Sequence, residues 1–135
     1  MAGCANRRDE AIRMEISRGQ IWWADFGEPV GSGPGFRRPA IVVQLNRINV
    51  TQIATVLVVP LTSNIRWANA PGNVLIPAGM AGMAEVSVAN VSLLTSIDRN
   101  QLETFAGRLP RNLLVAVNEG LRLILDIECP PGTLQ

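Results

Sequence analysis

The chain has 135 residues, a length that suits a single domain with a hydrophobic core of its own. Hydrophobic residues make up 47% of the sequence, but no apolar run approaches the roughly 20 residues that a membrane span needs, so we expect a cytoplasmic protein without a membrane partner. The net charge is +1, and histidine, lysine and tyrosine are absent. This excludes catalytic sites built on histidine and phosphate loops built on lysine, and leaves arginine as the only basic side chain.

The two ends of the chain differ from its middle. Residues 1–15 are polar and charged and lack both sheet periodicity and a signal-peptide pattern, so we expect a flexible leader there, with Met14 as an alternative start. One domain over 16–127 and a flexible tail over 128–135 should follow. The cysteines, Cys4 and Cys129, lie near opposite ends without metal-ligand spacing, which predicts free thiols and no metal or other cofactor.

Short strands dominate the predicted elements. The first covers 16–26 and places Trp22 and Trp23 on opposite faces, so one ring enters the core. The other ring is either covered by a loop or subunit or stacks on a nucleobase. A glycine-rich loop, Gly27 to Arg38, leads to apolar strands over 39–45 and 53–59. The remaining predictions are a turn over 46–52, strands over 73–77 and 104–109, a turn with a helical piece over 98–102, and a long extended stretch over 85–97 with a bend near Asn90.

One convincing helix is predicted, over 110–127. Its apolar positions recur with helical spacing, at Leu113, Leu114, Val117, Leu121, Ile124 and Leu125. Short strands at tight spacing with one C-terminal helix predict a mainly β fold, a small and strongly bent antiparallel sheet or partial barrel against which the helix packs.

The candidate site residues gather after the first and third strands. Arg37 and Arg38 end the glycine-rich loop, where guanidinium groups can bind phosphate, or can remain solvated in a surface ion pair. The hydroxyls of Ser32, Thr62 and Ser63 can orient a phosphate or bond to turn backbone.

A second loop holds Arg66 beside Trp67, a pair that can bind phosphate and stack bases, or that can fold back over the core. The acidic residues form no metal motif. We expect Asp25 and Asp98 at strand ends or turns, and Glu119 and Asp126 solvated on the helix.

Several segments, in this order, resemble the MazF/PemK family of bacterial toxins. The resemblance covers roughly residues 16–127 and is carried by Arg18-Gly-Gln-Ile-Trp-Trp-Ala-Asp-Phe, Gly31-Ser32, Arg38-Pro39-Ala40-Ile-Val-Val, Val59-Pro60-Leu61-Thr62-Ser63, Ile97-Asp98 with Leu102, and Glu119-Gly-Leu-Arg-Leu-Ile-Leu. It implies an SH3-like barrel of the type shared with CcdB toxins, and a homodimer neutralised by an antitoxin with a flexible acidic segment.

The resemblance also implies a metal-independent endoribonuclease that cuts single-stranded RNA at a short sequence. In the family the 2′-hydroxyl attacks the adjacent phosphodiester and leaves a 2′,3′-cyclic phosphate and a 5′-hydroxyl. The family's catalytic arginine and threonine fall on Arg38 and Thr62, and its loop Gly-Ser falls on Gly31 and Ser32. Arg37 is then expected to contact RNA or the antitoxin.

Two segments depart from the family pattern. Gly33 stands where many members carry a glutamate, so the resemblance assigns no general base, and Leu93-Leu94-Thr95 replaces a segment that often holds glutamine and arginine. Two alternatives stand beside the ribonuclease: a CcdB-like toxin that binds DNA gyrase through its C-terminal helix on the same scaffold, and an inactive binding module, which Gly33 leaves open.

Overall fold

The computed structural model describes residues 15–128. Cys4, Cys129 and nearly all of the predicted leader and tail lie outside the described residues. The described strands are β1 (Gln20–Asp25), β2 (Arg37–Val42), β3 (Thr55–Thr62), β4 (Val74–Ile76), β5 (Ser87–Ala89), β6 (Thr95–Asp98) and β7 (Leu102–Arg108). The helices are α2 (Asn46–Asn49) and α3 (Arg111–Leu125), and the 3-10 turns are η1 (Ile65–Asn69), η2 (Val91–Leu93) and η3 (Arg99–Gln101).

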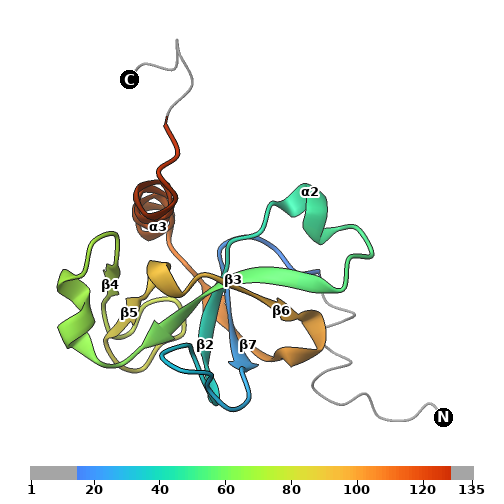
Figure 1. Cartoon of the computed structure of the whole chain (residues 1–135), viewed down its shortest axis with the longest axis horizontal. Coiled ribbons are helices and arrows are strands. Elements are labelled where there is room, and N and C mark those ends of the chain that lie inside the picture. The colour runs from blue at the N-terminus through green and yellow to red at the C-terminus, as the bar shows by residue number, and fades with distance from the viewer. Residues whose placement is uncertain (1–14, 129–135) are drawn as a thin grey trace.

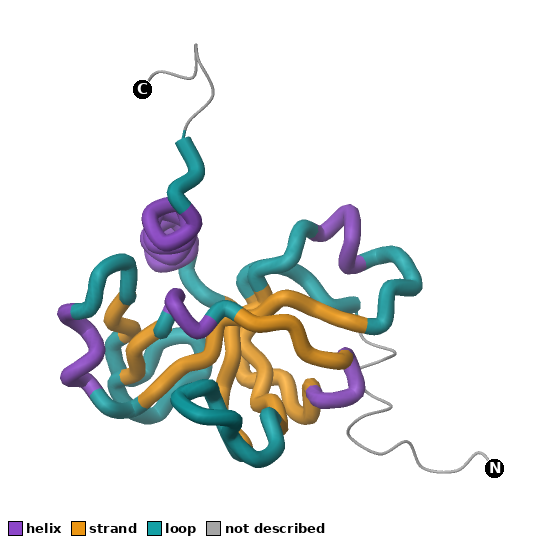
Figure 2. The backbone as a smooth tube through the Cα atoms, viewed as in Figure 1, coloured by secondary structure: helices purple, strands orange, loops and turns teal. Residues whose placement is uncertain are grey.

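All strand pairs are antiparallel, and the sheet curls around β3 (Figures 1 and 2). The hydrogen-bonded order is β4-β5-β3-β2-β1-β7, and β6 pairs with the first half of β3. The last two residues of β3, Leu61 and Thr62, pair with β5. The prediction of a mainly β, barrel-like fold with a C-terminal helix is confirmed.

Both faces of the curled sheet are buried. Along β1, Ile21 joins one apolar cluster and Trp22 the other, and Val59 and Val58 of β3 divide in the same way. This follows from the alternation of side chains in a strand. The two-sided burial explains why β2 and β3 are nearly continuous apolar runs.

Helix α3 covers one of these faces and lies beside β4 and η2 (Figure 1). Val117 and Leu121 are buried in the first cluster, whereas the predicted apolar positions Ile124 and Leu125 are 38% and 50% exposed. The helix closely approaches the turn that precedes β4 at Gly120, where an added Cβ would lie 2.1 Å from the carbonyl oxygen of Gly72. No helix among residues 15–128 is long and apolar enough to cross a membrane.

Arg18 ties the start of the sheet to α3. Its Nε donates to the carbonyl oxygen of Val43 at 2.8 Å, and its Nη2 donates to Oδ1 of Asn118 at 2.7 Å. Burial lowers the pKa of Arg18, because desolvation disfavours the charged guanidinium. The group still stays cationic at neutral pH, since arginine is not deprotonated in proteins.

The extended stretch predicted over 85–97 is divided in the structure. Both β5 and β6 run antiparallel to β3, but residues 90–94 stand opposite only residues 59–60. The residues of this segment that have no partner on β3 form the 3-10 turn η2. A hydrogen bond from the amide of Val91 to Oδ1 of Asn73, at 3.0 Å, holds this turn. The predicted turn over 46–52 likewise contains the short helix α2.

Candidate functional site

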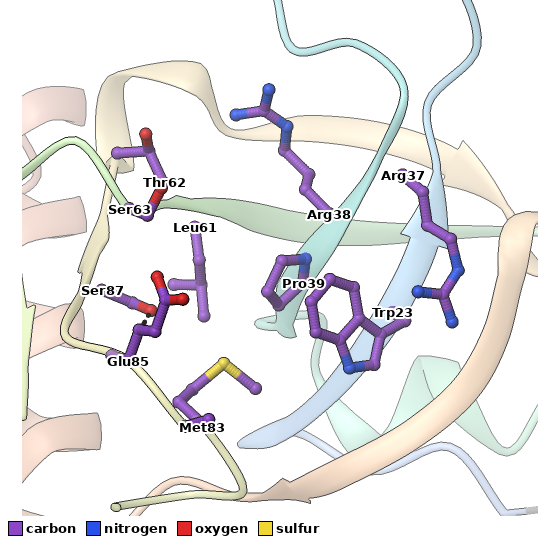
Figure 3. A pocket seen from close by; sticks show the side chains of 11 residues that line it. Trp23, Arg37, Arg38, Pro39, Leu61, Thr62, Ser63, Met83, Glu85 and Ser87 are labelled. Atoms are coloured by element: carbon purple, nitrogen blue, oxygen red, sulfur yellow. Dashed lines mark hydrogen bonds between the residues drawn. The ribbon is translucent and has the colours of Figure 1, made fainter. Parts of the chain in front are cut away.

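A cleft of about 370 Å³ opens beside the end of β3, between β1 and β2 on one side and the segment that enters β5 on the other (Figure 3). Four predicted site residues line it, from two strands and the turn after β3: Arg37, Arg38, Thr62 and Ser63. Trp23, one of the two rings considered for base stacking, also lines it. The rest of the lining comes from residues that the sequence did not single out as a site: Pro39, Leu61, Met83, Ala84, Glu85 and Ser87.

Arg38 is held by β2, where it pairs with Ala24 of β1. Its side chain is half-buried, and its Nε donates to the carbonyl oxygen of Gly35 at 3.1 Å. Within residues 15–128 it forms no ion pair, and its terminal amino groups have no acceptor. A cation held this way by backbone can receive a phosphate without first breaking a salt bridge.

Thr62 and Ser63 come from the opposite wall. Oγ1 of Thr62 accepts the amide of Asn64 at 3.1 Å, so its hydroxyl proton is available for a ligand. Thr62 also pairs with Val88 of β5, which fixes the backbone position of the hydroxyl. Figure 3 shows Arg38 extending toward the part of the cleft where Thr62 lies.

Arg37 behaves differently from its neighbour, because adjacent strand residues face opposite sides. Its Nε donates to Oε1 of Glu103 at 3.0 Å, and its Nη2 reaches Oγ1 of Thr104 at 3.4 Å. The guanidinium also lies 4.8 Å from the ring centroid of Trp23, in a cation–π contact (Figure 3). The outward tryptophan ring is therefore Trp23, and an arginine partly covers it.

Four other predicted residues lie outside the cleft lining. Gly31 and Ser32 are exposed in the β1–β2 loop, which projects from the sheet on the side away from α3 (Figure 2). Arg66 and Trp67 are exposed on η1, just beyond Ser63. The structure therefore separates the predicted set into a cleft group and two flanking segments.

The acidic residues for which the sequence predicted a position, Asp25, Asp98, Glu119 and Asp126, occupy it. Oδ1 of Asp25 accepts the amide of Gly27 at 2.9 Å, and Oδ1 of Asp98 caps η3 through the amide of Asn100 at 3.0 Å. Glu119 is exposed and paired with Arg122. Glu85, for which no position was predicted, lines the cleft. Its signal in the sequence was weak, an isolated acid two residues after Met83 at the edge of a predicted loop.

A second hollow, of about 370 Å³, has a mainly apolar lining that includes Leu57, Leu121 and Ile127. Its polar groups include Arg18 and Asn118, which are already bonded to each other. It contains none of the predicted site residues, so the cleft at Arg38 is the candidate site.

Comparison with known proteins agrees with the segments that carried the resemblance. Residues 17–125 match the model of a family described as PemK-like, MazF-like toxin of type II toxin–antitoxin system. The chain belongs to this MazF-like toxin family.

Relatives from this MazF-like family align with this chain over nearly their whole length. MazF6 of Mycobacterium tuberculosis H37Rv, named an endoribonuclease, is 40% identical over 114 residues, covering 84% of this chain and 100% of that protein. EndoA of Bacillus subtilis 168, also named an endoribonuclease, is 31% identical over 114 residues, covering 84% and 97%. A MazE–MazF crystal structure from Deinococcus radiodurans (Form-III) superposes with a TM-score of 0.68 at 25% identity, covering 85% of this chain and 100% of that chain.

Proposed function

We propose that this MazF-like toxin is a metal-independent endoribonuclease that cuts single-stranded RNA at a short sequence. The observation that carries the proposal is the meeting of Arg38 and Thr62 in one cleft, although 23 positions separate them in the chain. The names of MazF6 and EndoA support the same activity. A cleft with a free guanidinium and a free hydroxyl donor is suited to a phosphodiester.

The reaction needs no nucleophile from the protein. The 2′-oxygen of RNA forms a bond to the adjacent phosphorus, the bond from phosphorus to the 5′-oxygen breaks, and a 2′,3′-cyclic phosphate and a 5′-hydroxyl result. In this proposal Arg38 binds the non-bridging oxygens and stabilises the charge of the phosphorane, while Thr62 positions the phosphate. Removing one such preorganised donor typically lowers the rate about 100- to 1,000-fold.

The flanking segments extend the cleft into an RNA groove in this proposal. Gly31 and Ser32 form one wall, and Ser63, Arg66 and Trp67 continue from the other. Trp67 is 48% exposed on η1, which leaves ring surface on which an unpaired base can stack. Because Arg37 is bound to Glu103, we assign it a contact with the RNA backbone at the rim.

We also propose two protein partners. One is a MazE-like antitoxin whose flexible acidic segment competes with RNA for the arginines of the cleft; the MazE–MazF assembly from Deinococcus radiodurans supports a partner of this kind. The other is a second copy of the chain. Light scattering after gel filtration should give about twice the chain mass of 14.6 kDa for the toxin alone.

The deciding experiment incubates purified protein with a long RNA in the presence of EDTA and maps the ends of the products. Wild type should yield 5′-hydroxyl ends, and Arg38→Ala should cut about 100- to 1,000-fold more slowly. Arg111→Ala, an exposed arginine in the first turn of α3, is the matched control and should cut like wild type. Absence of cleavage by wild type on every RNA tried would refute the proposal and favour a gyrase-binding toxin, to be tested next by a gyrase-poisoning assay.

A further inference from the structure

We propose that Glu85 is the general base of this cleft, an inference that rests on the proposed ribonuclease function. The attacking 2′-hydroxyl must lose its proton, yet the sequence has no histidine, lysine or tyrosine. Arginine cannot accept the proton, because the guanidinium is already protonated at any working pH. A carboxylate is the remaining common type of general base, and among residues 15–128 Glu85 is the one acid that lines the cleft.

The neighbouring carboxylates are committed elsewhere. Oε1 of Glu103, on β7, is 3.0 Å from Nε of Arg37, and Glu103 is not among the residues that line the cleft. Oδ1 of Asp25 closes the β1–β2 loop through the amide of Gly27. Glu85 forms no ion pair within residues 15–128. Figure 3 shows its carboxylate pointing into the cleft, toward the part that holds Thr62 and Ser63.

The backbone on both sides of Glu85 is anchored, which makes the position of its carboxylate reproducible. Met83 is only 4% exposed and belongs to the main apolar cluster. Ser87 is buried at the start of β5, and its hydroxyl donates to the carbonyl oxygen of Glu85 at 3.2 Å. Gly82 rests directly on β7, where an added Cβ would lie 2.0 Å from the carbonyl oxygen of Ala106. The acid is therefore exposed at its tip and fixed at its base.

The proton balance of the step is simple. Glu85 takes the proton of the 2′-hydroxyl as the 2′-oxygen bonds to phosphorus. The departing 5′-oxygen, whose charge Arg38 stabilises, takes a proton from water. Glu85 then returns its proton to solvent, so that the protein ends the cycle unchanged. The carboxylate acts on one side of the phosphate and the guanidinium on the other, in keeping with their origin on opposite walls.

The test compares steady-state cleavage of one RNA oligonucleotide by wild type, Glu85→Gln and Glu119→Gln over a range of pH. Glu85→Gln keeps the shape of the side chain but removes the proton acceptor, and should lower kcat about 100- to 10,000-fold with little change in KM. Glu119→Gln makes the same chemical change on the exposed face of α3 and should leave both constants as in wild type. Urea unfolding of each variant checks that the fold is intact.

The pH profile separates a proton acceptor from a merely structural carboxylate. Besides Glu85, the charged residues lining the cleft are Arg37 and Arg38, and arginine does not titrate in the working range. The acid limb of the wild-type rate should therefore be absent from Glu85→Gln, while Glu85→Asp should keep it and regain part of the rate. The shorter acid also covers the case in which Glu85→Gln folds poorly.

The outcomes distinguish the role of Glu85 from the proposed ribonuclease function on which it rests. If wild type cuts RNA and Glu85→Gln cuts equally fast, the ribonuclease stands and Glu85 is not its base. If Glu85→Gln binds RNA more tightly and cuts faster, the carboxylate repels phosphate, and the inference is also overturned. If wild type cuts no RNA, the ribonuclease function itself fails, together with the role of Glu85.

Discussion

The wall of the cleft that carries Glu85 is held by a close contact between Gly82 and Gly107, which alanine substitution at either glycine tests, with Gly79→Ala as the control. Gly82 has a φ of 79°, and an added Cβ would lie 2.0 Å from the carbonyl oxygen of Ala106. Gly107, on β7, lacks a positive φ, but its added Cβ would lie 2.6 Å from the carbonyl oxygen of Ala81. Gly79 has a φ of 86° and no atom within 4 Å of the added Cβ.

The three variants therefore carry different costs. Gly79→Ala bears only left-handed backbone strain, about 1–2 kcal/mol. Gly107→Ala bears only the clash with backbone atoms, which cannot move aside like a flexible side chain, at about 1–3 kcal/mol. Gly82→Ala bears both, so we expect the free energy of unfolding to fall by about 2–5 kcal/mol, the largest loss of the three.

Urea unfolding followed by tryptophan fluorescence measures these differences. With a slope of about 1–3 kcal/mol per molar urea, they are resolved in the transition midpoints. Gly82→Ala should also slow RNA cleavage, because relief of the clash displaces the segment that carries Met83 and Glu85, whereas Gly79→Ala should affect cleavage less. Equal stability of Gly82→Ala and Gly79→Ala would refute the idea that close packing on β7 holds this wall.

Two further substitutions test single contacts. Thr62→Val keeps the shape of the side chain but removes the hydroxyl, and should lower the cleavage rate about 100-fold; exposed Thr55→Val on β3 is its control, and an equal rate in both would remove Thr62 from the site. Asn118→Ala deletes the acceptor of the half-buried Arg18 guanidinium, so the free energy of unfolding should fall by about 1–3 kcal/mol in urea titration, whereas exposed Asn112→Ala should leave it nearly unchanged. Wild-type stability of Asn118→Ala would show that the bond from Arg18 to α3 contributes little.

Much of the fold could be predicted from side-chain periodicity. The alternation in β1 placed Trp22 and Trp23 on opposite faces, and the structure buries Trp22 while Trp23 lines the cleft. The helical spacing placed α3 within two residues of its observed ends. These are local properties, because a strand or helix that buries one face shows it in its own sequence.

What the sequence could not predict depends on contacts between distant segments. The division of residues 85–97 follows from their register against β3, which no local pattern encodes. Helical spacing placed Ile124 and Leu125 on the apolar side of α3, yet both are exposed. The sheet beneath α3 covers only part of that side.

The sequence and the tertiary structure each determined part of the candidate site. Composition alone left arginine as the only strong cation, and the residues around Arg38 and Thr62 carried the family resemblance that the comparisons confirm. Only the tertiary structure decided that Arg37 is tied to Glu103 while the terminal amino groups of Arg38 are free, because that depends on the placement of β2 and β7 on either side of β1. The entry of Glu85 into the cleft was likewise decided by packing, since the segment before β5 is pressed onto β7 and anchored by Met83.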